Sequence, residues 1–346
     1  MTIKRAPTHL PTIDFSRFYG DADDRSKFIR TLTRTLHDHG FFYLTGHGVP
    51  QTLIDDVLAA SKRFFALSED EKLSIEMVKS SNFRGYNRAG YERTRGEQDW
   101  REQLDINTEG EPVAATANAP WRRLHGPNLW PQALPELKPL LLRYQAEVTR
   151  LGIDVLKAIA LSLGQAETVF ADIYEPSPSQ LLKIIRYPGR ENTGSAQGVG
   201  AHKDGGFVTV LLQDETPGLR IRTEEGLWIE APPVPGTFVM NTGELLELAT
   251  NGFVRADVHD VVTPPSGTER YSVAFFLGAR YDATIPLIAL PDELRRSERG
   301  VTVDPLNPIF REVGLNNLKS RLRSHPDVAA RHQSDLLHLL DQRADQ

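Results

Sequence analysis

The sequence predicts a mixed α and β fold in which a β sandwich or barrel is flanked by helical segments. Short β-branched or aromatic runs follow one another after Pro178, and turn residues separate them. Helical spacing of apolar residues dominates the chain before this point and returns from Pro308. A length of 346 residues suits about two domains of average size, or one large barrel with helical extensions.

The N-terminal part begins with a short strand and an amphipathic helix. Residues 10–16 predict the strand. A helix is expected over Asp23–Gly40, where Phe28, Leu32 and Leu36 are four residues apart and a glycine closes the run.

Further elements follow up to the β-rich part. Phe41–Leu44 predicts a short buried strand, and Leu53–Leu67 predicts a second helix. Ser68 and Glu71 have the spacing of a capping box, so another helical turn begins there. The segment 80–131 predicts loops and short strands. The longest helical pattern covers Pro135–Gly164.

Seven apolar runs predict the strands of the β-rich part: Leu181–Tyr187, Phe207–Gln213, Leu219–Arg222, Leu227–Glu230, Thr237–Asn241, Val254–Val262 and Tyr271–Leu277. The chain therefore divides into four expected regions: a mixed helical region 1–130, a long supporting helix 131–177, a β core 178–285, and a helical tail 286–346 that packs on the core.

Composition excludes several classes of function. The net charge is −6 and no long basic block occurs, so nucleic acid and anionic membranes are poor partners. The absence of cysteine excludes disulfides, thiolate catalysis and iron–sulfur clusters, and any metal must use nitrogen and oxygen ligands. No apolar run has the length of a membrane span or signal-peptide core. We therefore expect a cytoplasmic protein.

Two histidines and one aspartate suggest a metal site. His202 and Asp204 are two residues apart, so on an extended segment both side chains face one way. This pair alone is typical of surface turns. His259 adds a histidine on an apolar run, and together the three residues have the composition of the facial triad that binds non-haem Fe(II).

Arg270 and Ser272 suggest an anion site. On a strand both side chains face the same way, and a guanidinium beside a hydroxyl can bind a carboxylate. The alternative interpretation is that Arg270 is an ordinary strand arginine in a surface ion pair. The pair leads into a strongly apolar run, where a charge without a partner is costly. An anionic ligand is therefore a reasonable partner.

The order of these motifs resembles the isopenicillin N synthase-like family of iron(II)/2-oxoglutarate-dependent oxygenases. His259 lies 55 residues after Asp204, and Arg270 follows 11 residues later. The resemblance covers most of the chain, through segments 10–16, 37–50, 64–72, 181–189, 198–214, 217–221, 235–262 and 269–276. It implies a double-stranded β-helix, or jelly roll, as the core, with a helical N-terminal region and a helical C-terminal tail.

The resemblance also implies the roles of six residues. His202, Asp204 and His259 match the ligands of Fe(II). The pair that binds the distal carboxylate of 2-oxoglutarate corresponds to Arg270 and Ser272, and Tyr187 matches a tyrosine that often hydrogen-bonds the same carboxylate. The implied reaction consumes 2-oxoglutarate and O₂, releases succinate and CO₂, and hydroxylates a small molecule. Desaturation and ring closure are alternative outcomes.

A few positions depart from the commonest family pattern. Ile185 stands where plant members often have an asparagine. Lys203 and Asp260 are also unusual, but regular strands would point both away from the metal.

Several other residues are interpreted as structural. Gly243, Asn251 and Gly252 are expected to serve backbone turns, and His47, between two glycines, is expected in a turn rather than as a fourth ligand.

The substrate is the part that the sequence defines least. The loop 83–91 carries Arg84, Tyr86, Arg88 and Tyr91, whose cationic and aromatic character suits a small anionic or amphoteric substrate. An amino-acid derivative or a natural-product intermediate fits this description. The alternative for this loop is a solvated arginine surface.

Three other functions stay open at this point. An Fe(II) oxidase of the isopenicillin N synthase type would not need 2-oxoglutarate, because the Arg270 pair would bind the substrate's own carboxylate. A non-catalytic module that binds a small acid would use the same scaffold. A cupin-like metal enzyme is the third, and the N-terminal resemblance counts against it. The sequence does not define the oligomeric state.

Overall fold

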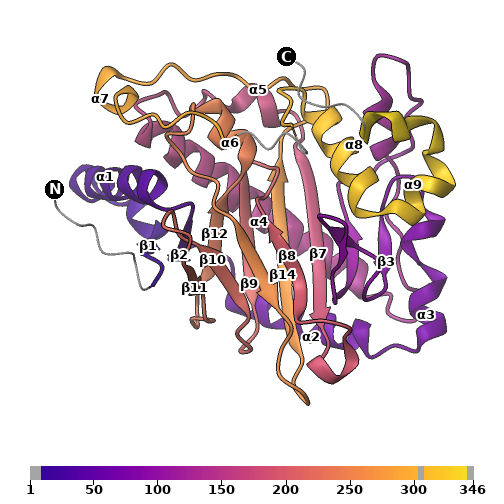
Figure 1. Cartoon of the computed structure of the whole chain (residues 1–346). Helices are drawn as coiled ribbons and strands as arrows, with labels where there is room; N and C mark the ends of the chain where they lie inside the picture. Colours follow the sequence, from indigo (N-terminus) through magenta and orange to yellow (C-terminus); the bar gives the residue numbers. More distant parts are fainter. Residues whose placement is uncertain (1–8, 303–307, 341–346) are drawn as a thin grey trace.

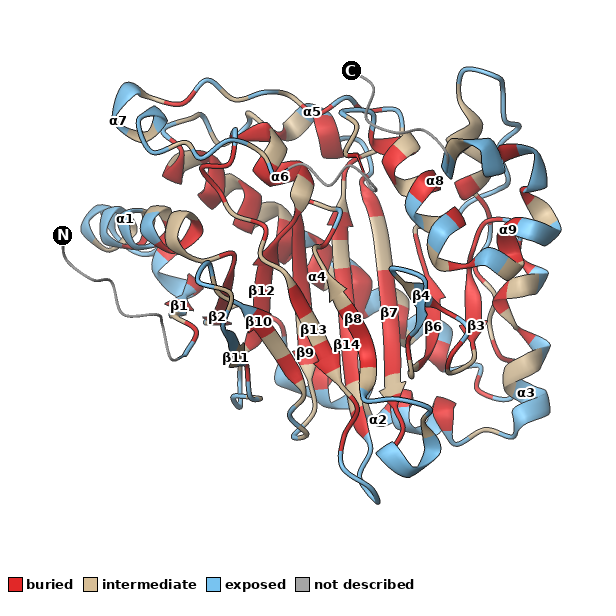
Figure 2. Cartoon of the chain, in the orientation of Figure 1, coloured by how far each residue is buried: buried red, intermediate tan, exposed pale blue. Residues whose placement is uncertain are grey.

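Two β sheets face each other, and helices cover the outer face of the larger sheet (Figure 1). The computed structural model describes residues 9–302 and 308–340. Both sheets lie in one layered body, which has the α+β architecture and jelly-roll core that the sequence predicted. The strands are buried over most of their length, whereas exposed residues gather on loops and on the outer sides of helices (Figure 2).

The larger sheet has eight strands in the order β1-β2-β12-β9-β14-β7-β6-β3. Its first pair is parallel, and the other neighbours are antiparallel. The strands in chain order are β1 (Thr12–Asp14), β2 (Phe41–Thr45), β3 (Gly85–Asn87), β6 (Glu102–Ile106), β7 (Ser179–Tyr187), β9 (Val208–Gln213), β12 (Phe238–Thr242) and β14 (Arg270–Gly278). Four of these strands come from the first 130 residues, so the N-terminal region extends both edges of the sheet.

The smaller sheet has four antiparallel strands in the order β11-β10-β13-β8. Their bounds are β8 (Gln197–His202), β10 (Leu219–Arg222), β11 (Trp228–Glu230) and β13 (His259–Val262). A separate hairpin pairs β4 (Arg93–Thr94) with β5 (Glu97–Gln98). The hairpin lies beside β8, since the carboxylate of Asp99 accepts a hydrogen bond from the Gly200 N–H at 3.0 Å.

The helices divide between the sheet face and the C-terminal tail. They are α1 (Ala22–Asp38), α2 (Gln51–Phe65), α3 (Glu69–Ser74), α4 (Leu137–Ser162), α5 (Ala171–Tyr174), α6 (Glu244–Ala249), α7 (Asp292–Arg295), α8 (Val313–Ser324) and α9 (Pro326–His332). Five short 3₁₀ turns lie at Phe15–Tyr19, Met77–Lys79, Pro120–Leu124, Arg190–Asn192 and Ser334–Leu340. Within these described residues, no helix combines the length and the apolar content that crossing a bilayer requires.

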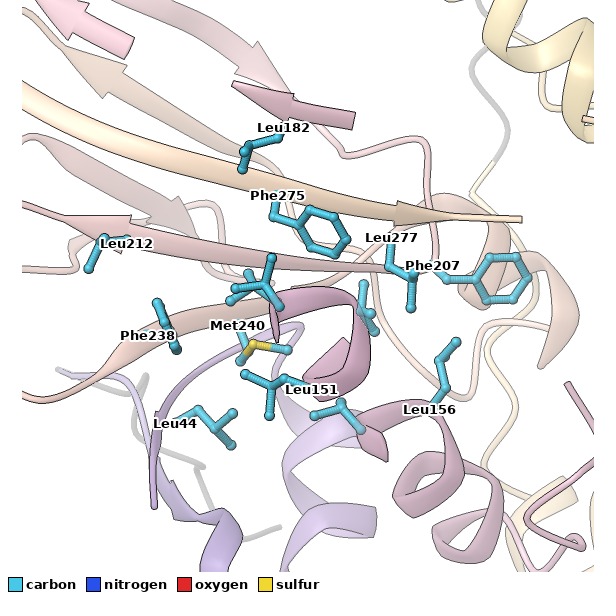
Figure 3. Close-up of a cluster of buried hydrophobic side chains, with 14 of the residues drawn as sticks. Leu44, Leu151, Leu156, Leu182, Phe207, Leu212, Phe238, Met240, Phe275 and Leu277 are labelled. Atoms are coloured by element: carbon cyan, nitrogen blue, oxygen red, sulfur yellow. The ribbon is translucent and has the colours of Figure 1, made fainter. Parts of the chain in front are cut away.

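The main core lies between the larger sheet and the helices. Leu151 and Leu156 of α4 pack against side chains of β7, β9, β12 and β14, among them Phe275 and Leu277 (Figure 3). Gly152 allows this close approach, because a Cβ at that position would lie 3.0 Å from Leu277 Cδ2. Burial of this continuous apolar surface is the main stabilising term for the layer.

A second core lies between the two sheets. Ile185, Val239 and Ala274 of the larger sheet pack with Val199 and Ile221 of the smaller one. Successive residues of a strand point to opposite faces. Every second residue of β7 and β14 therefore faces the helices, and the residues between them face the smaller sheet. The face between the sheets, which we call the inner face, carries the functional groups described below.

Most of the predicted elements are confirmed. The helices predicted in the N-terminal half appear as α1, α2 and α4, and the helical tail appears as α8 and α9. Ser68 and Glu71 form both hydrogen bonds of the capping box. Asn251 and Gly252 have φ of 47° and 74°, as expected for turn residues. The helix α1 ends at Asp38 with His39 as its C-cap, so the glycine predicted to close it, Gly40, directly follows the cap.

Two expectations about strands need correction. The strand predicted over Val254–Val262 is limited to β13, because residues 254–258 do not form a continuous ladder with a neighbouring strand. The alternation proposed for His202 and Asp204 does not hold, because β8 ends at His202 and Asp204 lies in the loop that follows. The strand β8 itself was not among the predicted runs, since its sequence contains two glycines and no continuous apolar stretch.

Candidate metal centre

His202, Asp204 and His259 lie together at one end of the smaller sheet. His202 ends β8 and His259 begins β13, and the two residues are direct partners across the strand pair. Asp204 Oδ1 lies 3.5 Å from His202 Nε2 and 3.7 Å from His259 Nε2. The three side chains can each offer one ligand atom within 4.8 Å of the others. The long-range pairing of β8 with β13 thus joins residues that are 57 positions apart.

Both histidine rings are oriented by the backbone. His202 Nδ1 lies 2.8 Å from the Gly200 carbonyl oxygen, and His259 Nδ1 lies 3.3 Å from that of Asp257. A carbonyl oxygen only accepts, so each Nδ1 carries a hydrogen, and Nε2 is the ring nitrogen left to bind a metal. These contacts therefore present both Nε2 atoms to the carboxylate in the tautomer that binds a metal.

The carboxylate of Asp204 is also oriented. Its Oδ2 atom accepts hydrogen bonds from Thr209 Oγ1 and Asn241 Nδ2, both at 2.6 Å. These donors come from the neighbouring strands β9 and β12, where the two residues are cross-strand partners. Because Oδ2 is occupied, Oδ1 is the oxygen that faces the histidines. Two neutral imidazole nitrogens and one carboxylate oxygen are a donor set that fits Fe(II) and leaves coordination positions open.

The electrostatics of the triad favour a bound cation. Burial alone would raise the pKa of Asp204, but attraction by His259 and His202 and hydrogen bonds from its neighbours hold this pKa well below its ordinary value. Burial, reinforced by repulsion from His202, lowers the pKa of His259 to about 4. Asp204 raises the pKa of His202 against the effect of burial. A buried, ionised carboxylate facing two imidazoles is an environment in which a cation restores the charge balance.

Removing one carboxylate-orienting donor should weaken metal binding without removing a ligand. We expect Thr209→Val to lower the affinity for Fe(II) about 10- to 100-fold, because Asp204 then loses a short hydrogen bond that orients it. Competition with a chromophoric chelator under anaerobic conditions measures the change. Thr237→Val is the matched control, since the Thr237 hydroxyl donates only to the nearby Val234 carbonyl. Equal losses in both variants would contradict this orienting role.

The loop that carries Asp204 approaches the backbone at Gly243. The Glu244 N–H donates to the Asp204 carbonyl oxygen at 2.7 Å, and a Cβ on Gly243 would lie 2.8 Å from that oxygen. Only glycine allows this approach, so the structural role predicted for Gly243 is confirmed. His47 lies elsewhere, with its ring centroid 4.4 Å from that of Phe238 and its Nδ1 accepting from the Val49 N–H, which agrees with a turn role.

Arg270 lies on the inner face with most of its hydrogen-bonding capacity unused. Its side chain is fully buried, Nη2 donates to Gln213 at 2.8 Å, and the guanidinium lies 4.8 Å from the centre of the Tyr187 ring. The Nε and Nη1 atoms of Arg270 and the hydroxyl of Ser272 are buried and have no protein partner within the described residues. Tyr187 is the cross-strand partner of Arg270. Unpartnered buried donors beside a fixed positive charge are what a ligand carboxylate would satisfy.

The two charged side chains that depart from the family pattern form ion pairs with residues outside the triad. Lys203 forms an ion pair with Glu247 at 2.8 Å, and Asp260 binds Arg220 through both oxygens. Both were expected to point away from the metal, and their partners agree with this. Ile185 lies on the inner face as the cross-strand partner of Ser272.

A network of buried charges continues the inner face beyond the two sites. Lys183 of β7 contacts Glu92 at 3.0 Å and Asp105 of β6 at 3.4 Å. Arg101 contacts Glu92 at 2.7 Å, and Arg321 of α8 contacts Asp105 at 2.8 Å. The network, which we call the charged cluster, comprises Glu92, Asp99, Asp105, Arg101, Lys183, Arg321 and His325. It connects the N-terminal region, the β core and the C-terminal tail.

The histidine of this cluster should make stability depend on pH. Burial lowers the pKa of His325 to about 4, with Arg321 and Lys183 adding to the effect against Glu92 and Asp105. The unfolded chain binds a proton near pH 6.5 and the folded chain does not, so stability is lost as the pH falls from 6.5 towards 4. We expect this residue alone to cost about 2 kcal/mol at pH 5.

Denaturant unfolding at pH 7 and pH 5 measures this contribution. His325→Gln should reduce the difference between the two free energies of unfolding, because the variant has no proton to bind at this position. His338→Gln, at an exposed position, is the control and should leave the difference unchanged. An unaltered difference in His325→Gln would show that this histidine does not carry the effect.

The four loop residues predicted to contact substrate have other partners. Tyr86 faces the helix side, where it bonds Glu102 at 2.5 Å and packs against Phe64. Arg84 is buried and donates to the carbonyl oxygens of Thr108 and Leu124. Arg88 pairs with Glu76 at 2.8 Å, and its guanidinium lies 4.2 Å from the centre of the Tyr91 ring. A substrate role for Arg84, Arg88 and Tyr91 stays a prediction, whereas Tyr86 points away from the inner face.

Sequence reasoning missed the residues that orient Asp204 and those of the charged cluster. One signal was present: Lys183 interrupts an apolar run and Asn241 ends one, each at a position that alternation places on a buried face. A buried polar side chain on a strand needs a partner, and that requirement could have singled out both residues.

Comparison with known proteins places this geometry in context. Residues 10–133 match the family described as non-haem dioxygenase in morphine synthesis N-terminal, and residues 178–279 match the 2OG-Fe(II) oxygenase superfamily. The 2-oxoglutarate-dependent dioxygenase frbJ of Dothideomycetidae sp. (strain 11243) is 35% identical over 335 residues, with 92% of this chain and 90% of the relative covered.

Two further similarities involve a named activity and a solved structure. A homoarginine-6-hydroxylase of Glycine max is 34% identical over 291 residues, which cover 80% of this chain and 87% of the relative. The crystal structure of a full-length Neurospora crassa protein in complex with alpha-KG and thymine superposes with a TM-score of 0.74 and 25% identity, covering 94% of this chain and 98% of that chain.

Proposed function

The chain belongs to the 2OG-Fe(II) oxygenase superfamily, and from this membership we propose that His202, Asp204 and His259 hold its iron. It is an enzyme, a non-haem Fe(II)- and 2-oxoglutarate-dependent dioxygenase that uses O₂ and acts on a small molecule. The donor set of the triad and the orientation of its three side chains support the assignment of the ligands. Fe(II) supplies the redox chemistry with O₂ when it is bound.

We propose that Arg270, Ser272 and Tyr187 bind the distal carboxylate of 2-oxoglutarate. The observation that carries this assignment is the set of buried, unpartnered donors on Arg270 and Ser272, which lie on the inner face together with the charge of the guanidinium. Gln213 binds Nη2 and so holds the guanidinium in place. Burial excludes water from these donors, which strengthens their interaction with an anion.

The chain's own residues have three tasks in the reaction. The backbone contacts of His202 and His259 hold a hydrogen on each Nδ1 and orient each Nε2 towards Asp204. Thr209 and Asn241 keep one carboxylate oxygen of Asp204 turned towards the histidines. The apolar residues around the two sites, such as Ile185 and Val199, keep water away from the reacting groups.

The boundaries 1–130, 131–177, 178–285 and 286–346 are proposed as functional regions. The β core carries the ligands and the 2-oxoglutarate residues, and the long helix supports the sheet from outside. The first and last regions, together with Lys183 of the β core, supply the charged cluster that extends the inner face. We propose that both terminal regions help to shape the substrate site.

For the substrate, we propose an amino-acid derivative or a related natural-product intermediate that the enzyme hydroxylates. Relatives named homoarginine-6-hydroxylases support this class, at 34% identity over 80% of the chain.

An anaerobic titration of the Fe(II)-loaded enzyme with 2-oxoglutarate tests the proposed sites. We expect a saturable visible charge-transfer band, followed by release of succinate when O₂ and a substrate amino acid are added. Bound iron without such a band would instead favour the oxidase that does not need 2-oxoglutarate. Failure to bind iron would overturn the assignment of the triad.

A further inference from the structure

Two residues of β6 are buried on the inner face and are not fully partnered. Gln103 and Asp105 have no exposed surface. Gln103 pairs across the sheet with Ile185, which pairs in turn with Ser272. Directly opposed residues point to the same face of a sheet. Gln103 therefore lies in the same row as the Ser272 hydroxyl, and Asp105 lies in the next row with Lys183.

Three hydrogen-bonding atoms of these two side chains have no partner in the protein's described residues. Neither the Oε1 nor the Nε2 atom of Gln103 has a partner within the described part of the chain, and Asp105 Oδ1 has none either. The other oxygen, Asp105 Oδ2, contacts Lys183 and Arg321. Buried carboxamides are normally satisfied, so an unpartnered one is costly to the free protein. The group that fits has an acceptor for Nε2 and N–H donors for Oε1 and Oδ1.

The charged cluster indicates the charge of that group. Three carboxylates, of Glu92, Asp99 and Asp105, face three cationic side chains, of Arg101, Lys183 and Arg321. Burial holds the pKa of His325 at about 4, so this histidine adds no charge at neutral pH. The cluster is therefore balanced, and an added ion of either sign would lack a counter-ion in a buried environment.

We propose that Gln103 and Asp105 are specificity-determining residues that bind an uncharged carboxamide or ureido group of the substrate. This inference rests on the proposed function. The carbonyl oxygen of the ligand accepts from Gln103 Nε2, and its N–H groups donate to Gln103 Oε1 and Asp105 Oδ1. A guanidinium of the same shape has no acceptor for Nε2 and adds a charge.

A pocket lies at one end of β6 and β7. Asn107 and Ser179 continue the rows of β6 and β7, and both line a pocket of about 600 Å³. Their side chains meet at the Tyr281 hydroxyl, with distances of 3.1 Å and 3.2 Å. The pocket therefore lies along the same two strands that carry Gln103, Asp105 and Lys183.

L-Citrulline and L-arginine are the probes that test this inference. They have the same shape and differ in a ureido against a guanidinium group. We expect equilibrium dialysis against the anaerobic Fe(II) and 2-oxoglutarate complex to show citrulline binding at least about tenfold more tightly than arginine. Gln103→Leu should abolish this preference, and Gln51→Leu, at an exposed glutamine on α2, should retain it.

A second measurement distinguishes ligand binding from a structural role. Gln103→Leu should melt at the same or a higher temperature than the parent protein without amino acid, because it replaces an unpartnered buried amide with an apolar group of similar size. A clear loss of stability would mean that Gln103 supports the fold, and would overturn the inference.

The outcomes separate this inference from the proposed function. Equal or tighter binding of arginine, or no binding of either probe, would overturn the inference while the 2-oxoglutarate band stays intact. Loss of the band in the parent enzyme would instead count against the proposed iron and 2-oxoglutarate sites.

Discussion

Asp204→Ala is expected to reduce succinate formation at least about 1,000-fold, which corresponds to about 4 kcal/mol of activation free energy. The carboxylate is the only anionic group of the triad, and without it two imidazoles face each other with their ring centroids 4.2 Å apart. Iron affinity should fall with activity, because two neutral ligands hold Fe(II) weakly. Metal content after anaerobic reconstitution and succinate release under saturating 2-oxoglutarate measure both effects.

Two further variants test whether the loss of activity in Asp204→Ala comes from misfolding. Asp204→Asn keeps the size of the side chain and an oxygen that can accept from Thr209 and Asn241, yet it removes the charge and should also lose activity. Asp260→Asn is the matched control, since Asp260 is beside His259 in sequence but binds Arg220. Full activity in Asp204→Ala would show that the triad is not the metal site.

Arg270→Ala is expected to raise the 2-oxoglutarate concentration needed for half-maximal rate about 100-fold or more, with a smaller effect on the rate at saturation. The guanidinium is fully buried, so its interaction with a carboxylate is not screened by water. Arg270→Lys should be intermediate, because it keeps the charge but loses the planar fork. Initial rates of succinate formation over a range of 2-oxoglutarate concentrations give both constants.

Arg220→Ala serves as the control for this experiment. Arg220 is also a strand arginine, but it is partly exposed and forms an ion pair with Asp260. Its removal should leave the 2-oxoglutarate requirement unchanged. If Arg270→Ala kept the parent requirement, the buried donors on this strand would need another ligand, and the substrate's own carboxylate would be the first to examine.

Local patterns were sufficient for most of the secondary structure. The helix α4 and the strand β14 each bury a long regular series of apolar residues, so periodicity alone locates them. The strand β8 was missed because its two glycines and its polar ends mask the pattern, and it is held by pairing with β13. Pairing between distant segments contributes nothing to local periodicity, and that is why this strand could not be found from the sequence.

The motifs of the metal triad and of the Arg270 and Ser272 pair could be recognised in the sequence for a different reason. A metal triad and the proposed carboxylate-binding pair require particular residue types, and these residues occur along the chain in a recognisable order. Substrate residues have no such signature. The loop 83–91 was proposed for its cationic and aromatic composition, but composition does not say that Tyr86 faces the helices.

The sequence by itself indicated the class of fold and put forward the triad and the pair Arg270 and Ser272, because residue types and the order of motifs are visible along the chain. Only the tertiary structure decided which side chains surround them. The registers of β6 with β7 and of β7 with β14 place Gln103 and Asp105 on the inner face. Cross-strand neighbours are set by hydrogen bonding between segments about 80 residues apart, and a one-residue change of register would turn them to the opposite face.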